Sequence, residues 1–429
     1  MTTSVSDKLL DTLQRTTFGY FINEVNLTNG LVLDRTNVGA PSSIAATGLA
    51  LAAYPVGVER GYITRADAIG RTLACMRFFW NSTQSEDKDA TGYKGFYYHF
   101  LDMKTGRRVW KCELSSVDTA FLLAGMLTAA EYFTLNTPEE SEIRTLANQL
   151  YERADWQWML NGGPTVSHGW TPENGFIPYR WQGYSEALLL YILALGSPTH
   201  MLPEETYTAW ASSYRWKKIY GTEFLYSGPL FTHQLSHVWV DFRGIRDPFM
   251  QSKQSDYFEN SRRATQVQRE YAIRNPMQFT GYGEHCWGLT ASDGPGWVTR
   301  TVDGIERRFF DYISRGVPYG PDDGTIAPWA VVASLPFAPD IVIPAIEQFD
   351  HLKLMDANPY GFKTSFNQTF PTKPAKSAGW ISAGHCGINQ GPIVLMIENY
   401  RTDLIWKLMR KCSYVVAGLR RAKFAGGWL

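Results

Sequence analysis

The sequence predicts an all-α protein in which apolar helices are enclosed by amphipathic ones. Three observations predict it: some helical segments are apolar on every side, others on one face only, and no Ser/Pro-rich or charged stretch divides the 429 residues. A helix without a polar face must be surrounded by protein. We therefore expect an inner ring of helices inside an outer ring, forming a single domain over residues 1–429, with an ordinary multi-helix globule as the alternative.

The outer helices are predicted from start signals. Residues 64–79 open with Thr64 and place Asp67 three positions on, the spacing of a capping box. Residues 137–158 begin with Thr-Pro-Glu-Glu, which puts Pro138 at the first helical position. Residues 256–274 form a third, highly charged segment.

The inner helices are predicted from segments that are apolar nearly all round. They are residues 43–54, 116–132, 184–195, 325–335 and 391–400. Long aromatic and Gly-rich loops connect the helical segments. Within them, residues 93–111 alternate well enough for a β-hairpin around residues 104–106.

Composition excludes several classes of protein. Lys and Arg number 41 and Asp and Glu number 41, so the chain lacks the basic face that a nucleic-acid binder needs. No apolar run reaches 18 residues and no signal peptide is visible, so we expect a soluble, cytoplasmic protein without membrane contact, or a periplasmic one if a leader has been removed. The 5 cysteines are widely spaced without a C-x-x-C motif, which favours a reducing compartment.

Polar groups recur at the start of the apolar helices. They are Asp118, Glu186, Asp323 and Asn389. If the inner helices are parallel, their N-termini converge on one mouth and bring these groups together. Each acid alone has a structural explanation, because helix N-termini favour negative charge. Glu186 is the strongest functional candidate: Glu is a poor N-cap, and burial at the base of an apolar helix raises a carboxyl pKa, as a general acid requires.

Aromatic residues accompany these acids, although aromatic residues are also common in protein cores. The sequence is 14% aromatic, and tryptophans and tyrosines lie near the candidate acids at Trp170, Trp181, Tyr184, Trp287, Trp297 and Trp329. Paired carboxylates with aromatic platforms are typical of glycoside hydrolysis. We therefore predict that Trp181, Tyr184 and Trp287 line a sugar-binding cleft.

Three other motifs carry less weight. His233 and His237 with Asp241 resemble metal-ligand spacing, but the Glu of H-E-x-x-H is absent and residues 238–240 look extended, so hydrogen bonding to substrate or to a neighbouring loop is favoured. Cys386 follows a histidine without a nucleophile signature, and residues 281–283 lack the third glycine of a dinucleotide motif. We expect no metal and no cofactor.

Taken in order, the segments resemble the glycoamylase-like family, related to β-1,2-glucanases of glycoside hydrolase families 144 and 162. The resemblance spans nearly the whole chain and is carried by these blocks: GLVLDR (residues 30–35), FYYHF (96–100), ELSSVDT (113–119), WQGYSEA (181–187), LFTHQLSHVWVDFR (230–243), WGLTASD (287–293), DGTIAP (323–328) and GPIVLMIENY (391–400). It implies an (α/α)6 barrel and inverting hydrolysis of β-linked glucans, with β-1,2-glucan as the expected oligosaccharide or polysaccharide substrate and Glu186 as general acid. The blocks also supply substrate-binding candidates: Asp34, Arg35, His233, His237, Asp241 and Arg243.

One position departs from the resemblance. Relatives usually carry Asp where this chain has Asn389. An amide accepts no proton at neutral pH, so Asn389 cannot replace a carboxylate base. Asp118 or Asp323 remain candidates for the base or for a subsite. The alternatives are a transglycosylase, a shifted linkage specificity, a non-catalytic glucan-binding protein, or an acid/base lyase or epimerase.

Overall fold

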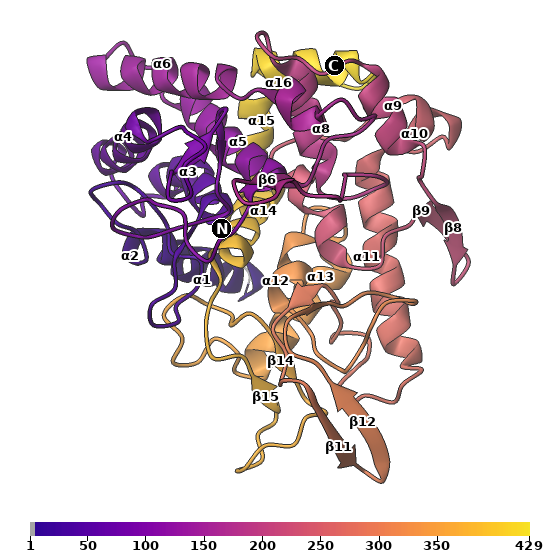
Figure 1. The fold of residues 1–429 in the computed structure, drawn as a ribbon. Helices are drawn as coiled ribbons and strands as arrows, with labels where there is room; N and C mark the ends of the chain where they lie inside the picture. The colour runs from indigo at the N-terminus through magenta and orange to yellow at the C-terminus, as the bar shows by residue number, and fades with distance from the viewer. Residues whose placement is uncertain (1–4) are drawn as a thin grey trace.

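The computed structural model describes residues 5–429 and is predominantly helical (Figure 1). The helices are α1 (Val5–Phe18), α2 (Tyr20–Asn23), α3 (Ile44–Glu59), α4 (Arg65–Asn81), α5 (Ser116–Tyr132), α6 (Pro138–Glu152), α7 (Trp156–Leu160), α8 (Ala187–Gly196), α9 (Glu205–Ala211), the 3₁₀ turns η1 (Leu230–His233) and η2 (Leu235–Val238), α10 (Pro248–Ser252), α11 (Tyr257–Arg274), α12 (Pro328–Ala333), α13 (Pro339–His351), α14 (Gly387–Thr402), α15 (Leu404–Met409) and α16 (Ser413–Arg421).

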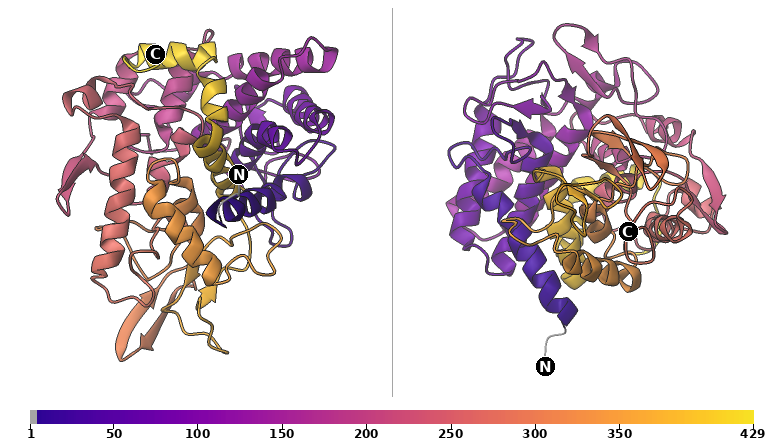
Figure 2. Two further views of the ribbon diagram at one scale, coloured as in Figure 1. Left: turned by 180° about the vertical axis from the view of Figure 1, so that it is seen from behind. Right: turned by 90° about the horizontal axis from the view of Figure 1, so that it is seen from below.

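The strands are short and form sheets of two or three strands. They are β1 (Ser42–Ser43), β2 (Gly92–Tyr93), β3 (Phe96–Tyr97), β4 (Phe100–Leu101), β5 (Leu114–Ser115), β6 (Gly169–Thr171), β7 (Gly175–Phe176), β8 (Trp216–Ile219), β9 (Thr222–Leu225), β10 (Ala291–Ser292), β11 (Val298–Val302), β12 (Ile305–Phe309), β13 (Ile313–Ser314), β14 (Phe366–Asn367) and β15 (Trp380–Ile381). The β11–β12 hairpin projects from the helices at the end of the molecule opposite α16 (Figures 1 and 2).

Six inner elements contact one another in a closed order. Helix α3 contacts α5 and α14, α5 contacts α8, and α12 contacts α14. The turn η2 contacts α8 and α14, and Gln234 between the two 3₁₀ turns donates from Nε2 to the carbonyl oxygen of Ala330 in α12 at 2.5 Å. All residues of α8 and α12 are buried. The prediction that the apolar segments form inner helices is confirmed.

Each inner element also contacts an outer helix. The pairs are α3 with α4, α5 with α6, α8 with α16, η1 with α11, α12 with α13, and α14 with α1. The predicted caps Thr64 and Thr137 accept hydrogen bonds from the backbone at the starts of α4 and α6, and Asp256 does so at the start of α11. The predicted helix over residues 137–158 is divided, because Asp155 caps a separate α7.

The expectation that residues 238–240 are extended is wrong. Val238 ends η2, and Trp239 continues in a turn. Two consecutive 3₁₀ turns have no 3.6-residue periodicity, so hydrophobic patterning gives no helical signal for this part of the inner ring.

The helices α3 and α5 pack with their backbones in close approach. A Cβ at Gly125 would overlap the carbonyl oxygen of Gly48, and a Cβ at Gly48 would meet the backbone of Phe121. Glycine at both positions lets the helices approach this closely. The start of α5 is thereby held beside the start of α3.

The predicted hairpin over residues 93–111 is only partly formed. Its turn is present, because Asp102 accepts from the backbone of Lys104 and Thr105 and Leu101 bridges Arg108. The strand β4, however, pairs with β1 at the start of α3. This pairing brings His99, immediately before β4, next to the inner helix starts.

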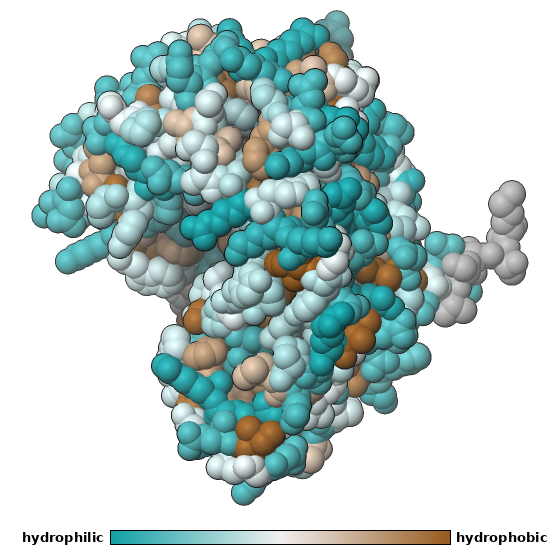
Figure 3. All heavy atoms as spheres, turned by 90° about the vertical axis from the view of Figure 1, so that its right-hand side faces the viewer, coloured by the Kyte–Doolittle hydropathy of each residue, from teal (hydrophilic) through white to brown (hydrophobic). Residues whose placement is uncertain are grey.

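No helix among residues 5–429 is both long and apolar enough to cross a membrane. On the face drawn in Figure 3, hydrophilic residues predominate and hydrophobic ones are scattered.

Candidate active site

A cavity of about 460 Å³ lies where the inner helices begin. Its walls include Ser43 at the start of α3, Asp118 in the first turn of α5, Glu186 at the start of α8, Trp329 in α12 and Asn389 in α14. The prediction that the inner helix starts converge on one mouth is confirmed. Three of the four polar groups singled out in the sequence are brought together.

Glu186 lines this cavity without capping its own helix. It precedes α8 in a helical conformation, and its side chain makes no cap hydrogen bond. Ser236 of η2 holds the backbone here, donating to the Glu186 carbonyl oxygen at 3.0 Å and accepting from Leu189 N at 3.1 Å. Burial raises the pKa of Glu186 to about 7, and the charge of Asp118 adds to this effect. A substantial fraction of the carboxyl is therefore protonated at neutral pH.

Asp118 is the third residue of α5 and is 6% exposed. Its Oδ2 accepts a 2.5 Å hydrogen bond from the hydroxyl of Ser115, the N-cap of the helix, and lies 3.6 Å from His99 Nε2. The Asp118 side chain thus contacts the N-cap of its helix, in line with the alternative that the acids stabilise helix N-termini. Because Asp118 also lines the cavity, it remains available to a bound molecule.

Glu113 and His99 form a second polar pair in the cavity wall. The Nδ1 atom of His99 lies 3.0 Å from Glu113 Oε1. Burial acts to raise the pKa of Glu113, but the hydrogen bond and charge of His99 outweigh it and hold this pKa below its usual range. Sequence reasoning missed both residues as site candidates, although they stand in two of the quoted family blocks.

Asp34 and Arg35 also line the cavity. Arg35 Nε donates to Asp34 Oδ2 at 3.1 Å, and its Nη1 lies 3.5 Å from Asp293 Oδ1. Asn389 stands 6% exposed in the first turn of α14 on the same cavity. The cavity therefore presents one guanidinium, an amide and several carboxyl groups.

The apolar walls are largely aromatic. Trp181 donates from Nε1 to Ser116 Oγ at 2.9 Å and stacks on His168 with ring centroids 4.0 Å apart. Other aromatic residues in the lining are Phe100, Phe121, Phe231, Tyr312 and Trp329. A wall of flat rings with a few directed polar groups suits a pyranose. His168 and Tyr312 were not singled out in the sequence, because their neighbours along the chain carry no recognisable motif.

Asp323 does not reach this cavity. It is 1% exposed, and both carboxylate oxygens accept from the fully buried guanidinium of Arg315 at 2.7 and 2.8 Å. Backbone N–H groups of Phe310 and Thr325 complete its contacts. The structure therefore places Asp323 in a buried ion pair, which leaves it no access to a substrate.

Two of the three predicted platform aromatics lie elsewhere. Trp287 is fully buried in the hydrophobic core. Tyr184 packs against Tyr214, His233 and Tyr257 and is absent from the cavity lining. Of the three, Trp181 alone lines the cavity. The prediction for Tyr184 relied on its proximity in sequence to Glu186, but the chain turns between Tyr184 and the start of α8.

The His233 and His237 motif is also structural. His233 Nε2 contacts the Ser227 carbonyl oxygen at 3.2 Å, and His237 Nε2 contacts Ser261 Oγ at 3.0 Å. Burial lowers the pKa of His233 to about 4 and that of His237 to about 3. The alternative of hydrogen bonding to neighbouring segments thus describes both residues. Neither lines the cavity.

The buried Asp241 and the partly exposed Arg243 form an ion pair near the C-terminal segment. Arg243 donates from Nε and Nη2 to the two Asp241 oxygens, each at 2.8 Å, and Arg410 also contacts Asp241. Trp428 Nε1 donates to the Asp241 carbonyl oxygen at 2.7 Å. These contacts join distant parts of the chain, and neither Asp241 nor Arg243 lines the cavity.

The His385 and Cys386 pair does not favour thiol chemistry. Burial raises the pKa of the cavity-lining Cys386 to about 12, and burial also lowers that of His385 to about 4. The pair is therefore neutral and carries no thiolate nucleophile. Within residues 5–429, no group of three or more His, Cys, Asp or Glu side chains is arranged to hold a metal ion.

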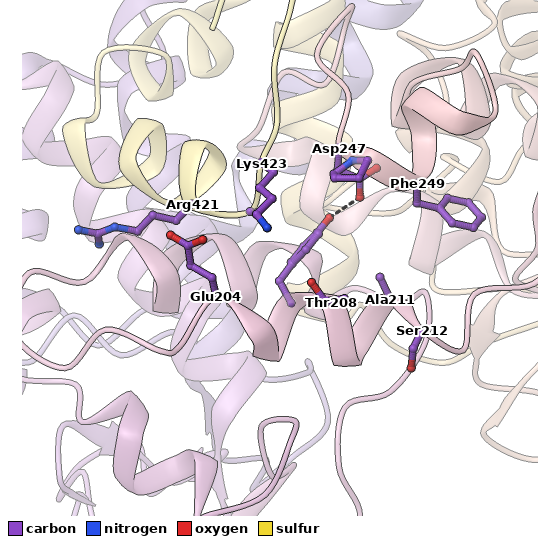
Figure 4. Close-up of a pocket in the computed structure, with 11 residues that line it drawn as sticks. Glu204, Thr208, Ala211, Ser212, Asp247, Phe249, Arg421 and Lys423 are labelled. Carbon is purple, nitrogen blue, oxygen red and sulfur yellow. Dashed lines mark hydrogen bonds between the residues drawn. The ribbon is translucent and has the colours of Figure 1, made fainter.

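A second, smaller cavity of about 230 Å³ lies beside α9, α10 and α16 (Figure 4). Its walls include Glu204, Arg421 and Lys423. Asp247 in this wall accepts from the Tyr207 and Tyr257 hydroxyls at 2.7 Å, so its carboxylate already has protein partners. The cavity of about 460 Å³, which Asp118, Glu186 and Asn389 line, is the candidate active site.

The fold and the cavity together define a helix-rich protein with a cavity lined by aromatic and carboxyl side chains. The family described as "Glycoamylase: Putative glucoamylase" matches residues 178–413, and the chain belongs to this family. A structure described as a putative glucoamylase from Bacteroides uniformis is 33% identical, covers 100% of both chains and superposes with a TM-score of 0.87.

Two further relatives carry named activities. An endo-β-1,2-glucanase from Chitinophaga pinensis, solved with sophorotriose and glucose, is 28% identical over 100% of both chains, with a TM-score of 0.85. An exo β-1,2-glucooligosaccharide sophorohydrolase from Parabacteroides distasonis is 29% identical. The match covers 97% of this chain but 58% of that relative, so this chain spans little more than half its length.

Proposed function

We propose that the protein is a glycoside hydrolase that cleaves β-1,2-linked glucans or gluco-oligosaccharides with inversion at the anomeric carbon. We propose further that residues 1–429 form one domain, an (α/α)6 barrel. The functional proposal rests on Glu186. Its carboxyl lies in an aromatic cavity together with Asp118 and does not cap its own helix. Its pKa is raised to about 7.

In the proposed reaction, Glu186 donates its proton to the glycosidic oxygen as the bond to the anomeric carbon breaks. Asp118 accepts a proton from a water molecule that attacks the anomeric carbon from the opposite face. The product is a sugar of inverted configuration, and the two carboxyls exchange protonation states before the next cycle. Asp118 suits the role of base better than Asp323, which is held by Arg315 outside the cavity.

Asn389 takes a different part in this proposal. Its amide lines the cavity but accepts no proton, so it acts by hydrogen bonding to the sugar or to the attacking water. Trp181 supplies a stacking surface, while Asp34 and Arg35 supply charged hydrogen-bonding groups. The β-1,2 linkage is proposed because two relatives are described as acting on β-1,2-linked glucose chains.

The test is a screen of purified protein against gluco-oligosaccharides of defined linkage, with products separated by chromatography. Release of reducing sugars from β-1,2-linked chains alone, with the new reducing end in the α configuration by NMR, supports the proposal. Altered chain lengths without new reducing ends mean transglycosylation. Unsaturated, ultraviolet-absorbing products mean a lyase. Binding by calorimetry without any product means a non-catalytic glucan-binding protein.

A further inference from the structure

The side chain of His99 lies between two carboxylates in the cavity wall. Its Nδ1 is 3.0 Å from Glu113 Oε1, and its Nε2 is 3.6 Å from Asp118 Oδ2. The ring of Phe100 stacks on it with centroids 4.0 Å apart and an interplanar angle of 10°. Each ring nitrogen thus faces a carboxylate oxygen, and Nδ1 is close enough for a hydrogen bond. The two nearby carboxylates favour a charged His99.

A second histidine in the same cavity provides an internal comparison. His168 stacks on Trp181, and burial lowers its pKa. Burial acts on His99 in the same direction, but the charges of Asp118 and Glu113 overcome it, with a smaller contribution from Asp34, and raise the pKa of His99 to about 9. The neighbouring carboxylates, rather than the cavity in general, therefore keep His99 charged at neutral pH.

The contacts of Asp118 are unevenly divided between its two oxygens. Oδ2 accepts from Ser115 Oγ at 2.5 Å and is the atom that faces His99. Glu113 fixes the far side of the imidazole, and Arg108 lies near enough to contribute to the low pKa of Glu113. The charge of Asp118 also helps to raise the pKa of Glu186. This arrangement leaves Oδ1 as the oxygen for proton transfer.

We infer that His99 is a positioning residue that holds the Asp118 carboxylate and aims its Oδ1 at the attacking water, with Glu113 orienting the imidazole from behind. The inference rests on the proposed function and deepens it. His99 lies next to Asp118, the proposed base, whereas Glu186 has the raised pKa that the proposed acid needs.

The first test compares kcat and KM in His99→Gln. Without the imidazole, the Asp118 carboxylate is no longer aimed at the attacking water, so kcat falls by roughly tenfold. KM changes little, because the sugar contacts remain. Glu113→Gln, which keeps the imidazole and removes the carboxylate that orients it, lowers kcat by less.

The matched control is His200→Gln. His200 lies 3.5 Å from Asp155, another histidine–carboxylate pair, but it is outside the cavity. Its kcat and KM should equal those of the wild type. If His99→Gln folds, as judged by circular dichroism, and also keeps the wild-type kcat, the inference is overturned.

A second readout is independent of turnover. Imidazole resonances followed by NMR should show His99 titrating near pH 9, and its titration should move to lower pH in Asp118→Asn and in Glu113→Gln. A His99 that is neutral at pH 7 overturns the inference even if the enzyme is active. If no glucan is cleaved, the proposed function has failed, and the role of His99 in this reaction falls with it. Cleavage of the glucan with an unchanged kcat in His99→Gln, even where His99 titrates as expected, refutes the positioning role and leaves the proposed function standing.

Discussion

Asp118 and Glu186 face one cavity from the first turns of two neighbouring inner helices, α5 and α8. Burial and the negative charge of Asp118 both raise the pKa of Glu186, to about 7. A carboxyl with a raised pKa beside a second carboxyl is an arrangement that suits acid–base catalysis.

Glu186→Gln should abolish turnover while leaving substrate binding nearly intact. The amide preserves the shape of the side chain and removes only the proton donor, so we expect kcat to fall by about 10²–10⁴-fold. Calorimetric titration with an oligosaccharide should give a dissociation constant close to that of the wild type. Full activity in this variant would show that another group is the acid.

Activity should decline at alkaline pH. A general acid works in its protonated form, and the raised pKa of Glu186 places the loss of that form near pH 7. The kcat profile should therefore fall above about pH 7, and it should do so tenfold per unit in the limit. A kcat profile that stays flat up to pH 9 would contradict the assignment of Glu186 as the general acid, because a carboxyl group is ionised at that pH.

The pair Asp118→Asn and Asn389→Asp identifies the base. If Asp118 is the base, its Asn variant loses at least about 10²-fold in kcat, and Asn389→Asp changes hydrolysis little. If position 389 is where a base is missing, Asn389→Asp raises hydrolysis instead. The double variant exchanges the carboxyl and the amide between positions 118 and 389. It therefore shows whether a carboxylate at position 389 can act as the base. Initial rates on a β-1,2-linked oligosaccharide give the measurement.

Trp181→Ala should weaken binding more than chemistry. Loss of a stacked ring from the cavity wall is expected to raise KM by about tenfold. Trp181→Phe is the matched control, since it keeps a ring but loses the hydrogen bond from Nε1 to Ser116. The fully buried Trp287 provides the contrast, because Trp287→Phe should lower the melting temperature without changing KM. Equal KM values for Trp181→Ala and the wild type would remove Trp181 from the binding surface.

Asp323→Asn should be a stability variant. It leaves the Arg315 guanidinium buried without its carboxylate partner, which is expected to cost about 3–5 kcal/mol of unfolding free energy. Denaturant titration measures this loss. Specific activity per folded molecule should remain near that of the wild type at low temperature, because Asp323 lies outside the cavity. A stable but inactive variant would return Asp323 to the list of catalytic candidates.

The sequence predicted local features that depend on neighbouring residues. The caps at Thr64 and Thr137 and the boundaries of α5 followed from spacing and hydrophobicity. The convergence of Asp118, Glu186 and Asn389 followed from their shared place at helix starts. The 3₁₀ turns η1 and η2 were missed, because their short, irregular turns have no hydrophobic period.

The sequence by itself determined which helices are buried, because an apolar stretch without a polar face has no stable position in water. It also determined that Glu186 begins such a helix. Only the tertiary structure decided which polar residues reach the cavity and which form ion pairs or hydrogen bonds with other parts of the protein. Asp323 meets Arg315, 8 positions earlier, and Asp241 meets Arg410, 169 positions away, whereas His99 reaches Asp118 through the pairing of β4 with β1. Such pairings depend on how distant segments pack, and packing sets the desolvation and charge that give each side chain its chemistry.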